Sequence, residues 1–270
     1  MLTRFARHFL LALQFFTRIP VTGRLAQWVG YSPAMLQASA AHFPGVGCVV
    51  GGASALFLKL AILLLPAQPA SVWVAVILSM VFSVMLTGAF HEDGLADTAD
   101  GLGGGQTRAQ TLDIMKDSRI GTYGAIALVL ALSAKFGLLV LLFQIGETGA
   151  LAGVFAAHVV SRLMPLLLMR NMVYVSDSLQ SKSKPLAHHL DKAELWIGVM
   201  WWGGSMGLVN LFMPAPVWLA GGLLALCATA WMGWRLQRRL QGFTGDGLGA
   251  TQQLSELGCY LGMAMASAWV

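Results

Sequence analysis

Long apolar segments recur along this chain of 270 residues and leave little room for a water-soluble fold. Hydrophobic residues make up 57% of the sequence and charged residues only 11%, whereas soluble domains are about a quarter charged. In a bilayer, a helix satisfies all of its backbone hydrogen bonds internally and needs about 20 apolar residues to cross. The sequence therefore predicts an all-α integral membrane protein, a polytopic helical bundle formed by one domain over residues 1–270.

About seven membrane spans are predicted, the last of which is long enough when it begins near Gly247. They cover residues 43–65, 72–90, 120–145, 149–169, 195–213, 216–234 and 247–270. The first twenty residues hold a shorter apolar run with Arg4, Arg7 and Arg18 near its ends. This pattern favours an N-terminal interfacial helix and leaves a further crossing as the alternative.

The connections between the predicted spans alternate in charge. Nearly all of their Lys and Arg residues lie in four segments, 21–42, 91–119, 170–193 and 235–246. Basic loops stay on the cytoplasmic side, so we expect these four segments to meet at the cytoplasmic face of the inner membrane. The formal net charge of +5 therefore reflects the excess of Lys and Arg in the segments expected on the cytoplasmic side. Nucleic acid is not an expected partner, because the sequence has no basic stripe with interleaved aromatic residues.

An acidic window, residues 91–124, separates the second and third predicted spans. It holds six of the twelve Asp and Glu residues of the chain, namely Glu92, Asp93, Asp97, Asp100, Asp113 and Asp117. Crowding of like charges between two apolar segments is unfavourable unless a cation binds among them. A solvated acidic loop is the alternative, but such a loop has no need of helical spacing.

The spacing of five aspartates in this window predicts a metal site. Asp93, Asp97 and Asp100 stand at i, i+4 and i+7, which places them on one face of a helix. Asp113 and Asp117 repeat the i, i+4 spacing and predict a second helical pair. Two converging carboxylate faces form an all-oxygen site, which suits Mg²⁺ completed by water and a substrate phosphate.

Four further charged residues are candidates for substrate binding. Arg119 and, more weakly, Lys116 can clamp a phosphate or neutralise part of the acidic cluster beside Asp117. Arg162 lies inside an apolar span, where an ionisable group is a functional candidate by default. Asp246 can bind a ribose hydroxyl, a base edge or a metal, or can instead cap the last helix.

The acidic window contains two motifs, HEDGLADTADG and IMKDSRIGTYG, that resemble the cobalamin synthase family, the adenosylcobinamide-GDP ribazoletransferases. The resemblance extends through nearly the whole chain, with FFTRIPV at 15–21, FPGVG at 43–47, SR at 161–162 and TGDGLGA at 244–250. It implies a membrane transferase of late cobalamin biosynthesis that requires Mg²⁺. Such an enzyme joins adenosylcobinamide-GDP to α-ribazole or α-ribazole 5′-phosphate and releases GMP.

A weaker resemblance is to the CDP-alcohol phosphotransferases, in which two acids three apart precede a Gly and two acids four apart follow. Asp97, Asp100, Gly101, Asp113 and Asp117 keep this order. The Ala-Arg pair that follows the Gly in that family is absent, which argues against a lipid-making enzyme. By analogy, Asp97, Asp100 and Asp117 are the expected catalytic residues, with Asp117 as the proton acceptor.

The expected partners are the two substrates and the lipid bilayer. A homo-oligomer, or a complex with other corrin-assembly enzymes, remains open. A cation transporter is the main alternative from another functional class, and a non-catalytic scaffold is a second. A transporter would carry acids deep inside several spans, whereas the acids here concentrate in one window.

Overall fold

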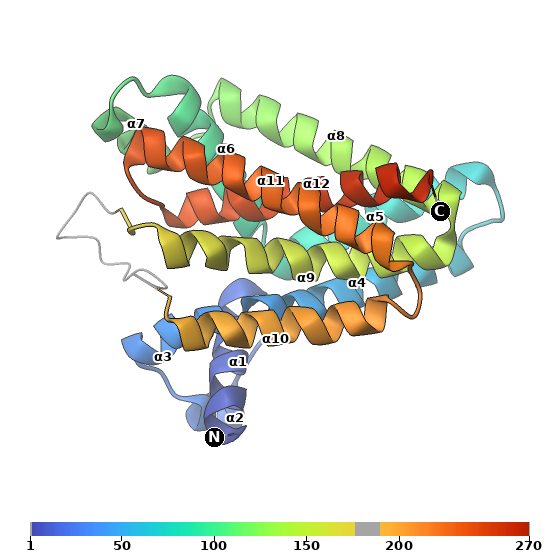
Figure 1. Cartoon of the computed structure of the whole chain (residues 1–270), viewed down its shortest axis with the longest axis horizontal. Helices are drawn as coiled ribbons and strands as arrows, with labels where there is room; N and C mark the ends of the chain where they lie inside the picture. The colour runs from blue at the N-terminus through green and yellow to red at the C-terminus, as the bar shows by residue number, and fades with distance from the viewer. Residues whose placement is uncertain (1, 176–189, 270) are drawn as a thin grey trace.

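The computed structural model describes residues 2–175 and 190–269, and nearly all of these residues are helical. Figure 1 shows long helices that lie side by side along the longest axis of the molecule. Most of the predicted polar loop at 170–193 falls on residues 176–189, which are outside the described residues. The prediction of an all-α helical bundle is confirmed.

Among the described residues, five helices are long and apolar enough to cross a membrane: α4 (Phe43–Leu64), α5 (Pro69–Thr87), α8 (Thr122–Ile145), α9 (Glu147–Asn171) and α11 (Ala215–Leu240). The other two predicted spans form α10 (Lys192–Val209) and α12 (Gly245–Ser267), which run alongside these five in Figure 1. They fall outside the set of long apolar helices because α10 includes Lys192, Glu194 and several Gly and Trp residues among its 18 residues, and α12 is rich in polar residues. The polar side chains of α12 are mostly buried against other helices, so this helix needs no continuous apolar surface.

The N-terminal segment folds into short helices, α1 (Leu2–Phe16), α2 (Gly23–Val29), α3 (Pro33–Ser39) and the 3₁₀ turn η1 (Ala40–His42). In Figure 1, α1 lies across the direction of the long helices, as expected for a helix at a membrane interface. The start of α3 is confirmed, because the Ser32 hydroxyl accepts a hydrogen bond from the backbone N–H of Met35 at 3.1 Å.

The middle of the bundle is formed by α9, which packs against α4, α8, α10, α11 and α12. Close approach of α4 to α9 depends on Gly47, because a Cβ atom there would lie 2.5 Å from the backbone oxygen of His158. Small residues of this kind allow membrane helices to pack backbone against backbone.

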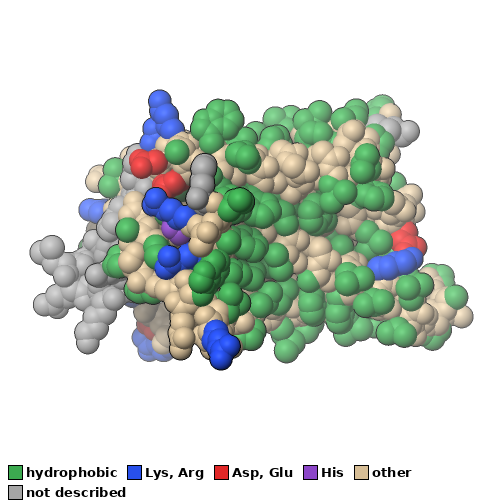
Figure 2. All heavy atoms as spheres, turned by 90° about the horizontal axis from the view of Figure 1, so that it is seen from below, with side chains coloured by type: hydrophobic (Ala, Val, Ile, Leu, Met, Phe, Trp, Pro, Cys, Tyr) green, Lys and Arg blue, Asp and Glu red, His purple; other side chains and the backbone are tan. Residues whose placement is uncertain are grey.

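The outer faces of the bundle are apolar, with exposed side chains such as Ile77 on α5, Val129 on α8 and Leu223 on α11. In Figure 2, hydrophobic side chains cover the middle of one side of the molecule, between a charged left end and a smaller charged group on the right. A continuous apolar surface between two polar ends is the expected surface of a protein embedded in lipid.

Successive long helices run in opposite directions, so that α6 (Phe90–Gly104) and α7 (Arg108–Met115) share one end of the bundle with the connection between α11 and α12 (Figure 1). The short connections from α4 to α5, from α8 to α9 and from α10 to α11 lie at the other end. The prediction that the described polar segments meet at one end of the bundle is therefore confirmed.

Substituting Gly47→Ala should force α4 away from α9 and lower the free energy of unfolding by about 1–3 kcal/mol, as overpacking does elsewhere. The matched control is Gly52→Ala on the same helix, where a Cβ atom would meet nothing within 4 Å. That change should be neutral, or stabilising by up to about 1 kcal/mol, because Ala favours helix over Gly. Thermal melting in detergent measures both, and equal melting temperatures for the two variants would contradict the packing argument.

Candidate active site

The acidic helix α6 is set at an angle to α5 by a tight turn. Gly88 and Ala89 both adopt left-handed backbone conformations, with φ of 69° and 59°. The backbone N–H of Arg18 donates to the oxygen of Leu86 at 2.7 Å, so the segment after α1 is fastened to this turn. A left-handed pair ends one helix and starts the next without a loop, and it holds the first acids of α6 close to the end of a span.

α6 packs directly on the start of α12 through glycines. A Cβ atom on Gly94 would lie 2.9 Å from the backbone oxygen of Asp246, and one on Gly249 would lie 3.3 Å from the Cα of Gly94. Asp246 does not cap α12, because the Thr244 hydroxyl accepts from the backbone N–H of Gly247 at 3.0 Å and fills that role. The Asp246 carboxylate therefore does not cap the helix. Asp246 lies in the first turn of α12, where this helix packs against α6 and its acids.

Four carboxylates crowd together where these helices meet. Burial, followed by the charges of Asp93, Asp246 and Asp100, raises the pKa of Asp97 to about 7. An aspartate ionises far less readily in such a setting, because removal from water and like charges both disfavour its charged form. The structure thus brings together the three aspartates predicted on one face of α6, and it adds Asp246 from a segment about 150 residues away.

Asp100 also links this cluster to the start of α8. Its two carboxylate oxygens accept the backbone N–H groups of Gly121 at 2.7 Å and Gly124 at 2.8 Å. The residue is only 8% exposed, and the bonds tie α6 to the first turn of α8. Asp100 is thus held rigidly by the fold, and each of its oxygens retains one lone pair for a further partner.

The predicted second helical pair, Asp113 and Asp117, is wrong as a structural element. α7 contains Asp113, but it ends at Met115, before Asp117. The Asp117 carboxylate instead accepts the backbone N–H of Arg119 at 3.0 Å and its guanidinium at 2.6 Å. A side chain that bonds the backbone two residues later competes with helix formation, which explains why α7 stops here. The hydrogen bond from Arg119 lowers the pKa of Asp117 to about 2.

The predicted phosphate-binding cations lie in two different settings. The side chain of Arg119 is 88% exposed at the same end as the carboxylates, and Lys116 is also exposed there. Arg162 is only 1% exposed and donates to Nδ1 of His158 at 2.9 Å inside the bundle. The structure therefore does not bring Arg162 to the surface on which the acidic cluster opens.

A buried polar network below the carboxylates was not predicted. Lys135 of α8 pairs with Glu256 of α12 at 2.7 Å, and Gln253 of α12 donates to Glu92 of α6 at 3.1 Å. Lys135 and Glu256 are both nearly inaccessible to solvent. The available signal was one charge of each sign inside two predicted spans, because charged residues within a membrane pair with one another. This network fixes α6, α8 and α12 relative to each other.

Comparison with known proteins identifies the family of this chain. A family model described as cobalamin-5-phosphate synthase matches residues 8–264. The adenosylcobinamide-GDP ribazoletransferase of Albidiferax ferrireducens is 50% identical over 98% of this chain and 99% of its own. Proteins of the same name from a Polaromonas species and from Shewanella piezotolerans are 48% and 43% identical, over 98% and 94% of this chain and 99% and 93% of their own.

No solved structure matches the chain. The family model and these relatives confirm the predicted family and the predicted transferase class. The chain belongs to the cobalamin-5-phosphate synthase family.

Proposed function

We propose that this protein is an adenosylcobinamide-GDP ribazoletransferase, the activity for which its relatives are named. It would join adenosylcobinamide-GDP to α-ribazole or α-ribazole 5′-phosphate and release GMP, in a late step of cobalamin biosynthesis. The observation that carries the proposal is the gathering of four carboxylates from α6 and α12 at one end of the bundle. Group transfer between phosphates needs such a site, because charge on the transferred group must be neutralised and held in line.

We propose that Mg²⁺ occupies this cluster when substrate is bound. Within the described residues, no three His, Cys, Asp or Glu side chains lie close enough to hold a metal ion alone. Mg²⁺ commonly binds through one or two carboxylates and takes water and substrate phosphate as its other ligands. A loose carboxylate cluster therefore fits an ion that is shared with the diphosphate of the substrate.

The charges that act on Asp97 come from Asp93, Asp246 and Asp100, which favours these four residues as the carboxylates that hold the ion. Asp113 and Asp117 were predicted as ligands beside them. Asp113 is exposed on α7, and Asp117 is engaged by Arg119. We therefore propose that Asp246 replaces the α7 pair in the metal site, with Asp100 anchoring α6 to α8.

In the proposed reaction, the ribose hydroxyl of α-ribazole attacks the phosphorus attached to cobinamide. A new O–P bond forms, the bond to the GMP oxygen breaks, and GMP leaves with both bonding electrons. The bound metal supplies charge neutralisation for the diphosphate. The hydroxyl proton passes to a carboxylate oxygen of the cluster. The hydrogen bond from Arg119 lowers the pKa of Asp117 to about 2, which makes the predicted proton acceptor a weak base.

Arg119 and Lys116 are proposed to hold the phosphates of the substrate at the mouth of the site. The guanidinium of Arg119 already binds the Asp117 carboxylate through Nε and Nη2, at 3.0 and 2.6 Å. Phosphate oxygens offer the same two-pronged geometry, so a substrate can exchange for that carboxylate. Arg162 has no proposed contact with substrate, because it is buried beside His158.

We also propose that the site faces the cytoplasm, with the protein in the inner membrane. Most of the Lys and Arg residues in the connections lie at the end of the bundle that carries α6 and α7. Basic connections remain on the cytoplasmic side during insertion. Both nucleotide substrates would then reach the carboxylates without crossing the membrane.

Replacing Asp97→Asn or Asp246→Asn should each lower product formation by about 100-fold or more, because each change removes a charge that holds the ion. The measurement is GMP release by purified protein given adenosylcobinamide-GDP and α-ribazole, with and without Mg²⁺. Asp113→Asn should stay near wild type if α12, and not α7, completes the site.

The control for this experiment is Glu147→Gln, which removes a carboxylate at the opposite end of the bundle and should leave activity intact. Retained activity in both Asp97→Asn and Asp246→Asn would refute the proposed ligands. Loss in Asp113→Asn with retention in Asp246→Asn would restore the set predicted from the sequence.

Stabilisation by Mg²⁺ should weaken as the pH falls through about 7. Without metal, folding raises the pKa of Asp97 from its ordinary 3.8 to about 7, so this residue disfavours the folded state increasingly as the pH rises across that window. Mg²⁺ binds the ionised carboxylate and competes with the proton. The rise in melting temperature on replacing EDTA with Mg²⁺ should therefore be larger at pH 8 than at pH 6.

Asp97→Asn should lose most of this pH dependence, since its amide does not titrate. The same rise in melting temperature at both pH values in the wild-type protein would show that Asp97 is not at the ion.

A further inference from the structure

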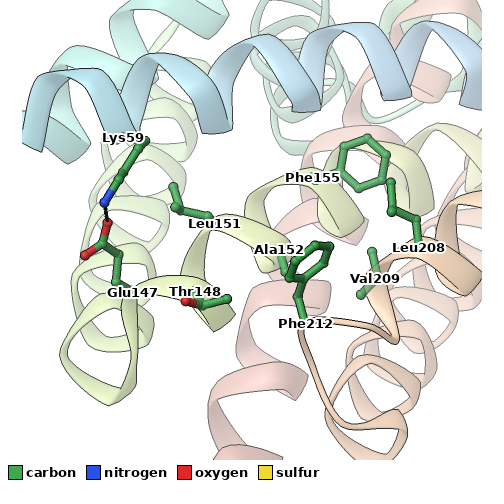
Figure 3. A pocket seen from close by; sticks show the side chains of 9 residues that line it. All are labelled: Lys59, Glu147, Thr148, Leu151, Ala152, Phe155, Leu208, Val209 and Phe212. Carbon is green, nitrogen blue, oxygen red and sulfur yellow. Dashed lines mark hydrogen bonds and ion pairs between the residues drawn. The ribbon is translucent and has the colours of Figure 1, made fainter.

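A pocket of about 430 Å³ lies at the end of the bundle opposite the acidic cluster, and we call it the lateral pocket. Figure 3 shows it between α4, α9 and the end of α10, with the side chains of Lys59 and Glu147 directed toward each other at one edge. The other lining residues are apolar apart from one threonine, namely Thr148, Leu151, Ala152, Phe155, Leu208, Val209 and Phe212. The lateral pocket therefore combines a single ion pair with a hydrocarbon lining.

The lateral pocket opens toward the lipid. Leu208 and Phe212 line it and are each about half exposed, and Leu60 and Leu63, which follow Lys59 on α4, are exposed as well. Exposed apolar side chains on the outside of a membrane bundle contact the hydrocarbon of the bilayer. The molecules that can reach this pocket from the side are therefore lipids.

The ion pair at the edge of the lateral pocket is isolated from other charges. Lys59 lies five residues before the end of α4, which is about 8 Å inside the helix end. Charged residues at such a depth are costly and rare, and they mark binding sites more often than packing contacts. Lys59 and Glu147 are the only charged residues in the described segments that form this end of the bundle, residues 57–76, 137–156, 201–224 and 258–269.

Both members of the pair have hydrogen-bonding capacity left over. Nζ of Lys59 donates to Oε1 of Glu147, and the two side chains are 40% and 38% exposed. Neither side chain forms another hydrogen bond with a described residue. An ammonium group has three N–H donors and each carboxylate oxygen accepts about two bonds, so two donors and the whole of Oε2 remain. These groups match a ligand that carries an anion and a cationic donor side by side.

We propose that the lateral pocket binds a phospholipid whose headgroup carries a phosphate and a primary ammonium, a phosphatidylethanolamine, in the leaflet away from the acidic cluster. The remaining N–H groups of Lys59 donate to the phosphate, and the ammonium of the headgroup donates to Oε2 of Glu147. Both contacts are charge-assisted hydrogen bonds, and the complex brings no net charge into the membrane boundary. This lipid site is separate from the proposed transferase activity and does not depend on it.

The apolar part of the lateral pocket has the shape that an acyl chain needs. On α9, Glu147, Leu151 and Phe155 stand at i, i+4 and i+8, so they share one face that extends about 12 Å from the ion pair into the bundle. A cavity of about 150 Å³ holds a benzene ring, so a pocket of 430 Å³ holds almost three times as much hydrocarbon. One acyl chain lying along α9 therefore fills this pocket while its headgroup stays at the ion pair.

The ion pair also discriminates between headgroups. Phosphatidylcholine carries a quaternary ammonium without N–H groups, so it leaves Glu147 without a hydrogen-bond donor. Phosphatidylglycerol carries a net negative charge, which the nearby carboxylate of Glu147 repels. Lys59 contacts the phosphate that all three lipids share. Selectivity therefore resides in Glu147, and general affinity for phospholipids resides in Lys59.

The test titrates three lipids with identical acyl chains, the ethanolamine, choline and glycerol phospholipids, into the delipidated full chain in a non-ionic detergent. Native mass spectrometry counts the bound lipids and gives each Kd. The wild-type protein should bind one phosphatidylethanolamine with a Kd at least about tenfold below those of the other two, which corresponds to 1.4 kcal/mol. Glu147→Gln should bind the ethanolamine and choline lipids about equally, and Lys59→Met should weaken binding of all three about tenfold.

A second pair of variants tests the apolar part of the lateral pocket. Ala152→Leu fills it, whereas Ala134→Leu adds the same side chain at an exposed position of α8 outside it. Phosphatidylethanolamine should raise the melting temperature of the wild-type protein and of Ala134→Leu, but not that of Ala152→Leu. Melting without lipid shows whether each variant folds. Glu147→Gln keeps the shape of the pocket and decides the question if Ala152→Leu does not fold.

The outcomes separate this site from the proposed activity, because none of the binding measurements requires turnover. Equal Kd values for the three lipids in the wild-type protein, preferential binding of phosphatidylglycerol, or no bound phosphatidylethanolamine would each overturn the assignment. Wild-type binding in both Ala152→Leu and Glu147→Gln would place the lipid elsewhere and overturn it too. Selective binding by a protein that releases no GMP would support the lipid site while refuting the transferase.

Discussion

The site depends on one close contact between backbones, the packing of α6 on the start of α12. Gly94 and Gly249 allow the two helices to touch, and no residue with a Cβ atom fits at Gly94 without moving Asp246. The contact places Asp246 beside the aspartates of α6, where burial and like charges act on Asp97. The fold thus builds electrostatic repulsion into a fixed place, which the binding of a cation would relieve.

That contact is stable because an ion pair and a hydrogen bond deeper in the bundle join α6 and α12 to each other and to α8. Lipid tails are as apolar as leucine, so hydrophobic burial alone does not set how membrane helices slide or rotate against each other. The Lys135–Glu256 pair joins α8 to α12, and the bond from Gln253 to Glu92 joins α12 to α6. Breaking a buried ion pair leaves an uncompensated charge, so the helices keep one register.

Much of this architecture was predictable from the sequence, because it follows from local patterns. Apolar length predicted the long helices, and i, i+4, i+7 spacing placed Asp93, Asp97 and Asp100 on one face of α6. The end of α7 was not predictable from spacing, because the bond from Asp117 to the Arg119 backbone competes with the helix at that point. Spacing describes what a helix would present, and does not establish that the helix continues.

The role of Asp246 and the pairing of Lys135 with Glu256 required tertiary information. Asp246 meets Asp97 of α6, and Lys135 meets Glu256, across more than 100 residues of sequence. Both meetings depend on how α6, α8 and α12 rotate about their own axes. A sequence shows which charges need partners inside a membrane, but it does not give the rotation that selects the partner. The sequence therefore placed the acidic residues at one end of the bundle, but it did not show that Asp246 lies beside them.

The rotation of α6 about its own axis connects the acidic cluster to the polar core of the bundle. His91 and Asp93 are two residues apart and so project about 200° apart around the helix, with His91 buried inside the bundle and Asp93 exposed beside the other carboxylates. Glu92, between them, is bonded to Gln253 of α12. A small rotation of α6 would break that bond and misplace the carboxylates. The buried polar network therefore fixes the rotation of α6, and with it the direction in which its aspartates face.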